Sequence, residues 1–161
     1  MALFDLFRRR FLTAVEREQI EIGLAEAGRH TRARIGLSID ERAGKDPQAR
    51  AQALFRQWDL PEDERPTAVL VYVSAPSRTF AIVGGEEVRR AAPQTFWEAA
   101  ERDFRHHFAE GRYCDGIFKA LAQVALELER LFPRGREEAA GGRPNTSEDP
   151  VGNPNPTDRT A

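Results

Sequence analysis

The feature that most constrains the fold is an apolar run over residues 67–74, which resumes after a short break over residues 78–83. The first run is rich in valine and ends at the turn residues Ala75-Pro76-Ser77. A continuous apolar run of this length indicates a strand that is buried on both faces. The break is too short for a crossover connection, so we expect the two segments to pair as an antiparallel hairpin at the centre of a sheet.

Segments on either side of this hairpin carry patterns that would cover the sheet. Thr13-Ala14-Val15-Glu16 has the spacing of a capping box, which predicts a helix start, and residues 34–40 alternate with the period of a strand. Asp46-Pro47 predicts a second helix before the central strand, an order that favours a parallel strand pair. Two further helices are predicted over residues 93–111 and 113–132. The pattern therefore indicates an α/β fold with a small mixed β-sheet and helices on both faces.

Composition divides the 161 residues into three parts. Residues 1–12 form a short N-terminal amphipathic segment, and residues 13–133 hold the patterned elements of one domain. Residues 134–161 are rich in Gly, Pro, Asn, Thr, Ser and charged residues, and Val151 is their one larger aliphatic residue. Such a composition cannot bury enough apolar surface to offset chain entropy, so we predict a disordered tail.

Charge and cysteine content restrict the partners and the compartment. Lys plus Arg number 24 and Asp plus Glu number 26, which gives a net charge of -2 with the two signs alternating along most of the chain. We therefore expect no nucleic acid partner, because phosphate binding requires a basic surplus on some face. The single cysteine, Cys114, permits no intramolecular disulfide, which fits a reducing, cytoplasmic location.

The N-terminal segment has an amphipathic character of its own. Its aromatic and basic residues include Phe4, Phe7, Arg8, Arg9 and Arg10. The apolar stretch precedes the charges and contains Asp5, which argues against a cleaved secretory signal. Aromatic residues at helical spacing beside arginines suit a membrane surface, so one hypothesis is a membrane-peripheral interaction protein. The alternative is that these aromatics cover an edge of the core. No apolar segment approaches the roughly 18 residues that span a bilayer.

Acidic side chains gather in two loops that the predicted topology brings to one end of the sheet. The carboxylates before the central strand and after the hairpin are Glu62, Asp63, Glu64, Glu86 and Glu87. Hard divalent cations prefer oxygen ligands from loop carboxylates, so Asp63, Glu64, Glu86 and Glu87 form a candidate Ca²⁺ or Mg²⁺ site. In the competing interpretation, the neighbouring arginines Arg32, Arg34 and Arg65 neutralise these carboxylates as surface ion pairs.

Other reactive side chains predict little chemistry. His106, His107, Cys114 and Asp115 match no standard zinc spacing. Cys114 lies near a predicted helix start, where a lowered pKa and a reactive thiol are a minor hypothesis. Neither a phosphate-binding glycine loop nor a nucleophile motif occurs, so the sequence nominates no catalytic residue. The two tryptophans lie on apolar stripes and are expected to pack in the core.

The patterned part of the chain, from Thr13 to Pro133, resembles the TPM domain. The matching stretches are residues 68–74, residues 78–84, Phe96-Trp97, residues 107–113 leading to Gly116-Ile117, and residues 53–58. This family includes thylakoid-lumen photosystem repair proteins, a nematode receptor-modulating protein and many small bacterial proteins. The resemblance implies an α/β/α sandwich around a small mixed sheet.

The resemblance also suggests functions. Plant-type members have been assigned acid phosphatase activity, some bacterial members bind calcium or magnesium, and others are accessory proteins. This sequence departs from the family pattern at Gly85, where aspartate is frequent, and at Pro66 and Arg34. We therefore expect a binding or accessory module with an unknown protein partner and weak or absent divalent-cation binding. The enzymatic alternative is a metal-assisted acid phosphatase, in which the candidate loop carboxylates hold the ion.

Overall fold

The computed structural model describes residues 12–41 and 46–135. The predicted membrane-contacting residues Phe4, Phe7, Arg8, Arg9 and Arg10 lie outside these ranges, as does nearly all of the predicted tail. The described elements are α2 (Ala14–Ala27), β1 (Ile35–Asp40), α3 (Pro47–Gln57), the 3₁₀ helix η1 (Arg65–Thr67), β2 (Val69–Ser74), β3 (Thr79–Gly84), α4 (Glu86–Ala91), α5 (Gln94–Ala109) and α6 (Tyr113–Leu131). None of the described helices is long and apolar enough to cross a membrane.

The starts of α2 and α3 follow from local side-chain chemistry. Thr13 and Glu16 form the predicted capping box, in which Glu16 N–H donates to Thr13 Oγ1 at 3.1 Å and Thr13 N–H donates to Glu16 Oε2 at 2.8 Å. Asp46 Oδ1 accepts from the backbone N–H of Gln48 at 3.0 Å and of Ala49 at 3.2 Å. Both helices therefore begin where the sequence predicts, because the capping partners lie within four residues of each other.

One sheet holds the three strands, in the order β1-β2-β3. β1 runs parallel to β2, with Ile35 opposite Val69, and β3 runs antiparallel to β2, with Gly84 opposite Val69. All residues of β2 are buried, whereas both β1 and β3 contain partly exposed residues. The prediction of a mixed sheet around a fully buried central strand is confirmed.

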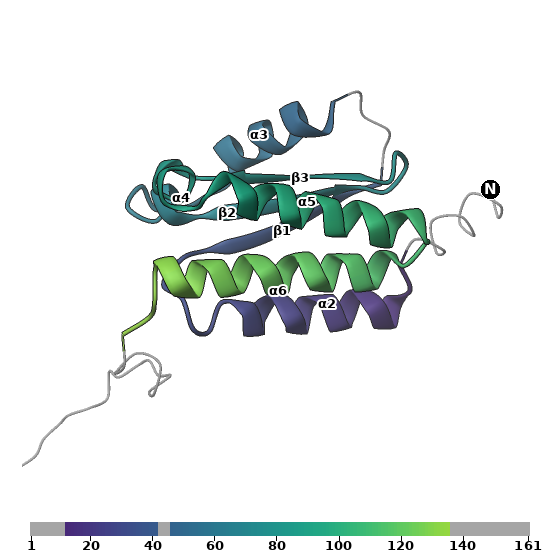
Figure 1. Cartoon of the computed structure of the whole chain (residues 1–161), viewed down its shortest axis with the longest axis horizontal. Coiled ribbons are helices and arrows are strands. Elements are labelled where there is room, and N and C mark those ends of the chain that lie inside the picture. The colour runs from purple at the N-terminus through teal and green to yellow at the C-terminus, as the bar shows by residue number, and fades with distance from the viewer. Residues whose placement is uncertain (1–11, 42–45, 136–161) are drawn as a thin grey trace, which may run out of the picture.

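Helices cover both faces of this sheet (Figure 1). α3 packs against β2 and β3 on one face, and α2, α5 and α6 lie on the opposite face. The chain is therefore an α/β/α sandwich, as the resemblance to the TPM domain implies.

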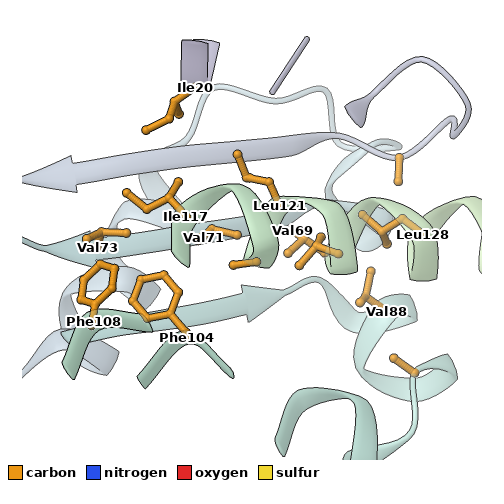
Figure 2. Close-up of a cluster of buried hydrophobic side chains, with 14 of the residues drawn as sticks. Ile20, Val69, Val71, Val73, Val88, Phe104, Phe108, Ile117, Leu121 and Leu128 are labelled. Carbon is orange, nitrogen blue, oxygen red and sulfur yellow. The ribbon is translucent and has the colours of Figure 1, made fainter. Parts of the chain in front are cut away.

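The two faces of β2 belong to cores of different size. Val69, Val71 and Val73 lie in the larger core, where Figure 2 shows them facing side chains of α6 and α5. Tyr72 and Leu70 lie in two smaller clusters on the α3 side. This alternation is the period of two that a strand imposes. Each buried valine contributes about 1.5–3 kcal/mol.

Candidate functional site

Three loops meet at the end of the sheet where β1 and β2 begin and β3 ends. Val69 N–H donates to Arg34 O at 2.8 Å, and Gly85 N–H donates to Ala68 O at 2.8 Å. These bonds join the loop before β1 to the entry of β2, and the entry of β2 to the loop after β3. The structure therefore brings together the two acidic loops that the predicted topology placed at one end.

Two of the four candidate cation ligands in these loops are paired with arginines. Arg34 Nε donates to Glu64 Oε2 at 2.6 Å, and Arg90 Nη2 donates to Glu86 Oε1 at 2.8 Å. The interpretation that Arg34 neutralises a nearby carboxylate is confirmed. Glu86 is neutralised instead by an arginine one turn further along its own helix.

The other two candidate ligands, Asp63 and Glu87, are exposed. Within the described residues, no group of three or more His, Cys, Asp or Glu side chains is arranged to hold a metal ion. Four carboxylates that do not converge lack the set of six or more oxygens that calcium prefers. They do not fit a preformed cation site, and cation binding here stays a prediction.

Arg65 and Arg32, the other two arginines at this end of the sheet, contact groups other than carboxylates. Arg65 Nη1 donates to Phe55 O at 2.7 Å and Arg65 Nη2 donates to Trp58 O at 2.6 Å. These carbonyls lie at the C-terminal end of α3, where backbone acceptors lack helical partners and the helix dipole is negative. Arg32 lies over the ring of Phe132, with 5.1 Å from its guanidinium carbon to the ring centroid. The interpretation of Arg32 and Arg65 as partners of the carboxylates is therefore wrong.

Gly85 lets two of the loops approach each other closely. A Cβ atom at this position would lie 2.2 Å from Arg65 O and 2.5 Å from Pro66 O. The backbone of Gly85 has φ -67° and ψ 176°, which any residue can adopt, so space and not conformation requires glycine. The resemblance placed an aspartate at this position, and the path of the chain at Pro66 leaves no room for one here.

A groove of about 1250 Å³ opens beside this end of the sheet. One wall comes from α3, the other from α4 and the start of α5, and the last residues of β3 lie between them. Its polar and aromatic lining includes Gln48, Gln52, Arg56, Arg89, Gln94 and Trp97. Glu86 is the one predicted cation ligand that lines the groove, and Asp63, Glu64 and Glu87 do not. Glu62, which lies in the same loop as Asp63, also lines it.

Most of the residues in this groove were not predicted as site residues from the sequence. Gln48, Gln52 and Arg56 are exposed and spaced four residues apart on α3, which is a polar stripe that the helical period makes visible. Trp97 packs against the larger core, as expected, but also lines the groove. No local pattern indicates that Trp97 and Arg89 would line one groove with residues of α3, because tertiary packing brings these elements to the same end of the sheet.

Cys114 is not an activated thiol. It lies in the first turn of α6 and is partly buried against the larger core. Burial raises the pKa of the Cys114 thiol, and the negative charges of Glu16 and Asp115 raise it further. The minor hypothesis of a lowered pKa is therefore wrong, because desolvation and two carboxylates outweigh the helix terminus.

The two histidines at the end of α5 each have a nearby partner. His107 Nδ1 lies 2.8 Å from Asp103 O, and His106 Nε2 lies 3.3 Å from Glu110 Oε1. Both contacts span one helical turn within α5 and its C-terminal cap. Their positions are explained by local helix geometry.

The layered sheet, the three meeting loops and the groove define a small α/β/α domain whose surface chemistry lies at one end of the sheet. Residues 8–126 match the sequence profile of the TPM domain. Since this match covers more than half of the chain, the chain belongs to the TPM domain family. No curated protein sequence matches it.

Solved structures share this fold. The BA42 protein from the psychrophilic bacterium Bizionia argentinensis superposes with a TM-score of 0.71 at 23% identity, over 79% of this chain and 88% of that chain. The N-terminal domain of a P. gingivalis protein gives 0.61 at 17% identity, over 76% and 79%. The N-terminal domain of the cg2496 protein from Corynebacterium glutamicum gives 0.54 at 13%, over 73% and 74%. At these identities the likeness establishes the fold alone.

Proposed function

We propose that this TPM domain is a binding module that holds a protein partner in the groove between α3 and α5, with weak or absent divalent-cation binding. The observation that carries the proposal is the groove itself. Ile82 and Val83 give it an apolar floor, which Phe55 and Trp97 extend onto the two walls. Polar side chains of α3, α4 and α5 form its rim. An apolar floor with a few polar groups around it is typical of sites that bind by contact.

The rim also carries polar groups that are available to a partner. Arg56 and Arg89 are exposed and form no ion pair with any described residue. Gln48, Gln52 and Gln94 add amide donors and acceptors along the two walls. Such groups give orientation and specificity to a ligand that the apolar floor holds.

The arrangement of the loop carboxylates supports weak or absent cation binding. A cation at Glu64 or Glu86 has to replace Arg34 or Arg90, although an exposed ion pair of this kind is worth only about 0–1 kcal/mol. The larger obstacle is that the carboxylates do not gather around one point, so each would have to move to reach a shared ion. The metal-assisted acid phosphatase also requires these carboxylates to hold one shared ion.

A cation titration separates the binding module from the phosphatase. We expect Ca²⁺ or Mg²⁺ to shift the amide NMR signals around Glu64 and Glu86 gradually, without saturating below millimolar concentration. We also expect no cation-dependent hydrolysis of p-nitrophenyl phosphate at acid pH. Saturation at micromolar cation, abolished in Glu64→Gln and Glu86→Gln but retained in the α5 surface variant Glu101→Gln, would support the phosphatase instead.

Groove binding itself is tested with peptides selected from a displayed random library against the full chain. Gln52→Trp places an indole in the groove, and Gln57→Trp places one on an exposed position of the same helix outside it. We expect selected peptides to lose affinity for Gln52→Trp and to keep it for Gln57→Trp. Equal binding to both variants, or no selected peptide, would contradict the proposed function.

A further inference from the structure

β3 is an edge strand of the described sheet, since β2 is its one neighbour there. Gly85 N–H donates to Ala68 O, which marks this residue pair as hydrogen-bonded across the two strands. Antiparallel neighbours alternate between hydrogen-bonded and non-hydrogen-bonded pairs. Odd-numbered residues of β3 therefore bond to β2, while Phe80 and Ile82 direct their backbone N–H and C=O groups away from β2, toward the free edge.

The groove lies beside the last residues of this edge, since Ile82, Val83 and Gly84 line it and Phe80 does not. Ile82 and Val83 both line it, although adjacent residues of a strand point to opposite faces of the sheet. Ile82 packs with the larger core, and Val83 packs with the small clusters under α3. A groove that touches both side chains runs beside the strand and not over one face. Figure 1 shows α3 and α5 lying along β3 on its two sides, so they form the walls of an edge groove.

The rim of this edge groove has a surplus of positive charge. Arg56 on α3 and Arg89 on α4 carry exposed guanidinium groups without an ion-pair partner in residues 12–41 and 46–135. Arg65 adds a third positive charge that bonds to main-chain carbonyls and no carboxylate. Two acidic residues line the groove. Glu86 is already paired with Arg90, which lies outside the groove, so Glu62 is the one acidic lining residue that remains to offset the positive charges.

We propose that the edge groove binds an extended acidic segment of a partner protein, which adds to β3 as a further strand. Main-chain bonds to Ile82 within the groove, and to Phe80 further along the same edge, would hold the segment regardless of its sequence. Its carboxylates would pair with Arg56 and Arg89, which selects acidic segments over basic ones. The inference rests on the proposed function, because it specifies the partner of the same groove.

Charge selection is tested by amide NMR on the full chain with two probe peptides at low salt. The acidic probe is acetyl-Thr-Val-Glu-Asp-Val-Val-amide, whose adjacent acidic side chains point to the two opposite walls. The basic probe carries lysine at both acidic positions. We expect the acidic probe to shift the amides of Phe80 and Ile82 and to bind roughly tenfold more tightly than the basic one. The variant Arg56→Glu/Arg89→Glu should reverse this preference, whereas Arg102→Glu/Arg105→Glu on the exposed side of α5 should keep it.

Strand addition is tested with acidic probes that are N-methylated at alternate residues. A strand donates to its neighbour from every second residue, so methylation in one register should abolish binding and methylation in the other should leave it nearly unchanged. Equal binding of both methylated probes, no preference for the acidic probe, or shifts centred on β1 would overturn the inference. The proposed function would survive each of these results if library-selected peptides still distinguish Gln52→Trp from Gln57→Trp, so the two failures are distinguishable.

Discussion

Tyr72 is a buried phenol whose hydroxyl donates a hydrogen bond to Asp40, the last residue of the edge strand β1. Its side chain is 1% exposed, and its Oη donates to Asp40 Oδ2 at 3.0 Å. Arg50 Nε donates to the same carboxylate oxygen at 3.3 Å. Burial raises the pKa of the Tyr72 hydroxyl, and the hydrogen bond to Asp40 and its negative charge raise it further. The folded protein therefore favours the neutral phenol.

This pKa shift makes stability depend on alkaline pH. A folded-state pKa above the unfolded value of about 10 contributes stability below pH 10 that is lost as pH rises through the folded pKa. We expect Tyr72→Phe to cost about 1 kcal/mol near neutral pH through the lost hydrogen bond, and to flatten the alkaline fall in the free energy of unfolding. Urea unfolding across this pH range measures both effects. An unchanged alkaline slope in Tyr72→Phe would contradict this assignment.

Gly85 and Gly28 make a matched pair for testing the close approach of the loops. Gly85→Ala would push a Cβ against the carbonyl oxygens of Arg65 and Pro66, whereas a Cβ at Gly28 meets its nearest atom, Ala25 O, at 3.8 Å. We expect Gly85→Ala to lower the free energy of unfolding by about 2 kcal/mol or more through overpacking. Gly28→Ala should be neutral or stabilising by about 0.5 kcal/mol. Similar values for the two variants in denaturant unfolding would argue against the crowding.

The end of α3 depends on a side chain from a later part of the chain. Asp46 caps the start of this helix from within the same segment, but the carbonyls at its end are bound by Arg65, beyond the return loop. The start was predicted from sequence because cap and helix are adjacent. The arginine that binds the carbonyls at the end of α3 was not predicted, because several arginines lie near this end in the sequence and nothing local distinguishes Arg65 from them.

Arg65→Lys tests this cap without removing the charge. Lysine cannot reproduce the forked pair of hydrogen bonds to Phe55 O and Trp58 O, so we expect a loss of about 1–2 kcal/mol and faster amide exchange in the last turn of α3. Arg56→Lys is the control on the same helix, because Arg56 is exposed and makes no such bonds. Its cost should stay within about 0.5 kcal/mol. If Arg65→Lys loses no more stability than Arg56→Lys, the positive charge of residue 65 is enough and the forked hydrogen bonds do not stabilise the fold.

The two helical layers are unequal in the surface they bury. The layer of α2, α5 and α6 shares the larger core with β2, whereas α3 contacts two small clusters that include Ala51, Phe55 and Tyr72. Since buried apolar contact sets local stability, the α3 layer is expected to open first. Native-state hydrogen exchange should give lower opening free energies for amides of α3 than for residues 117–124 of α6. Equal opening energies in both layers would indicate one cooperative unit and contradict this expectation.

Much of the architecture was predictable because it depends on periodicity and short-range chemistry. The unbroken apolar run of β2, the three-residue break after Ser74 and the caps at Thr13 and Asp46 are local signals, and each predicted its element. The topology then placed the two acidic loops together correctly. What those loops contain was less predictable, because the partners of Glu64 and Glu86 depend on side-chain reach and not on spacing along the chain.

The sequence alone therefore determined the mixed sheet with helices on both faces, since hydrophobic period and turn length leave few other ways to bury β2. Tertiary packing determined which surfaces meet. It closed the space beside Gly85, turned Arg65 toward the carbonyls of α3, and set Trp97 and Arg89 opposite Arg56 across the free edge of β3. These contacts join residues that are distant in the chain, and their geometry exists only after the layers have packed.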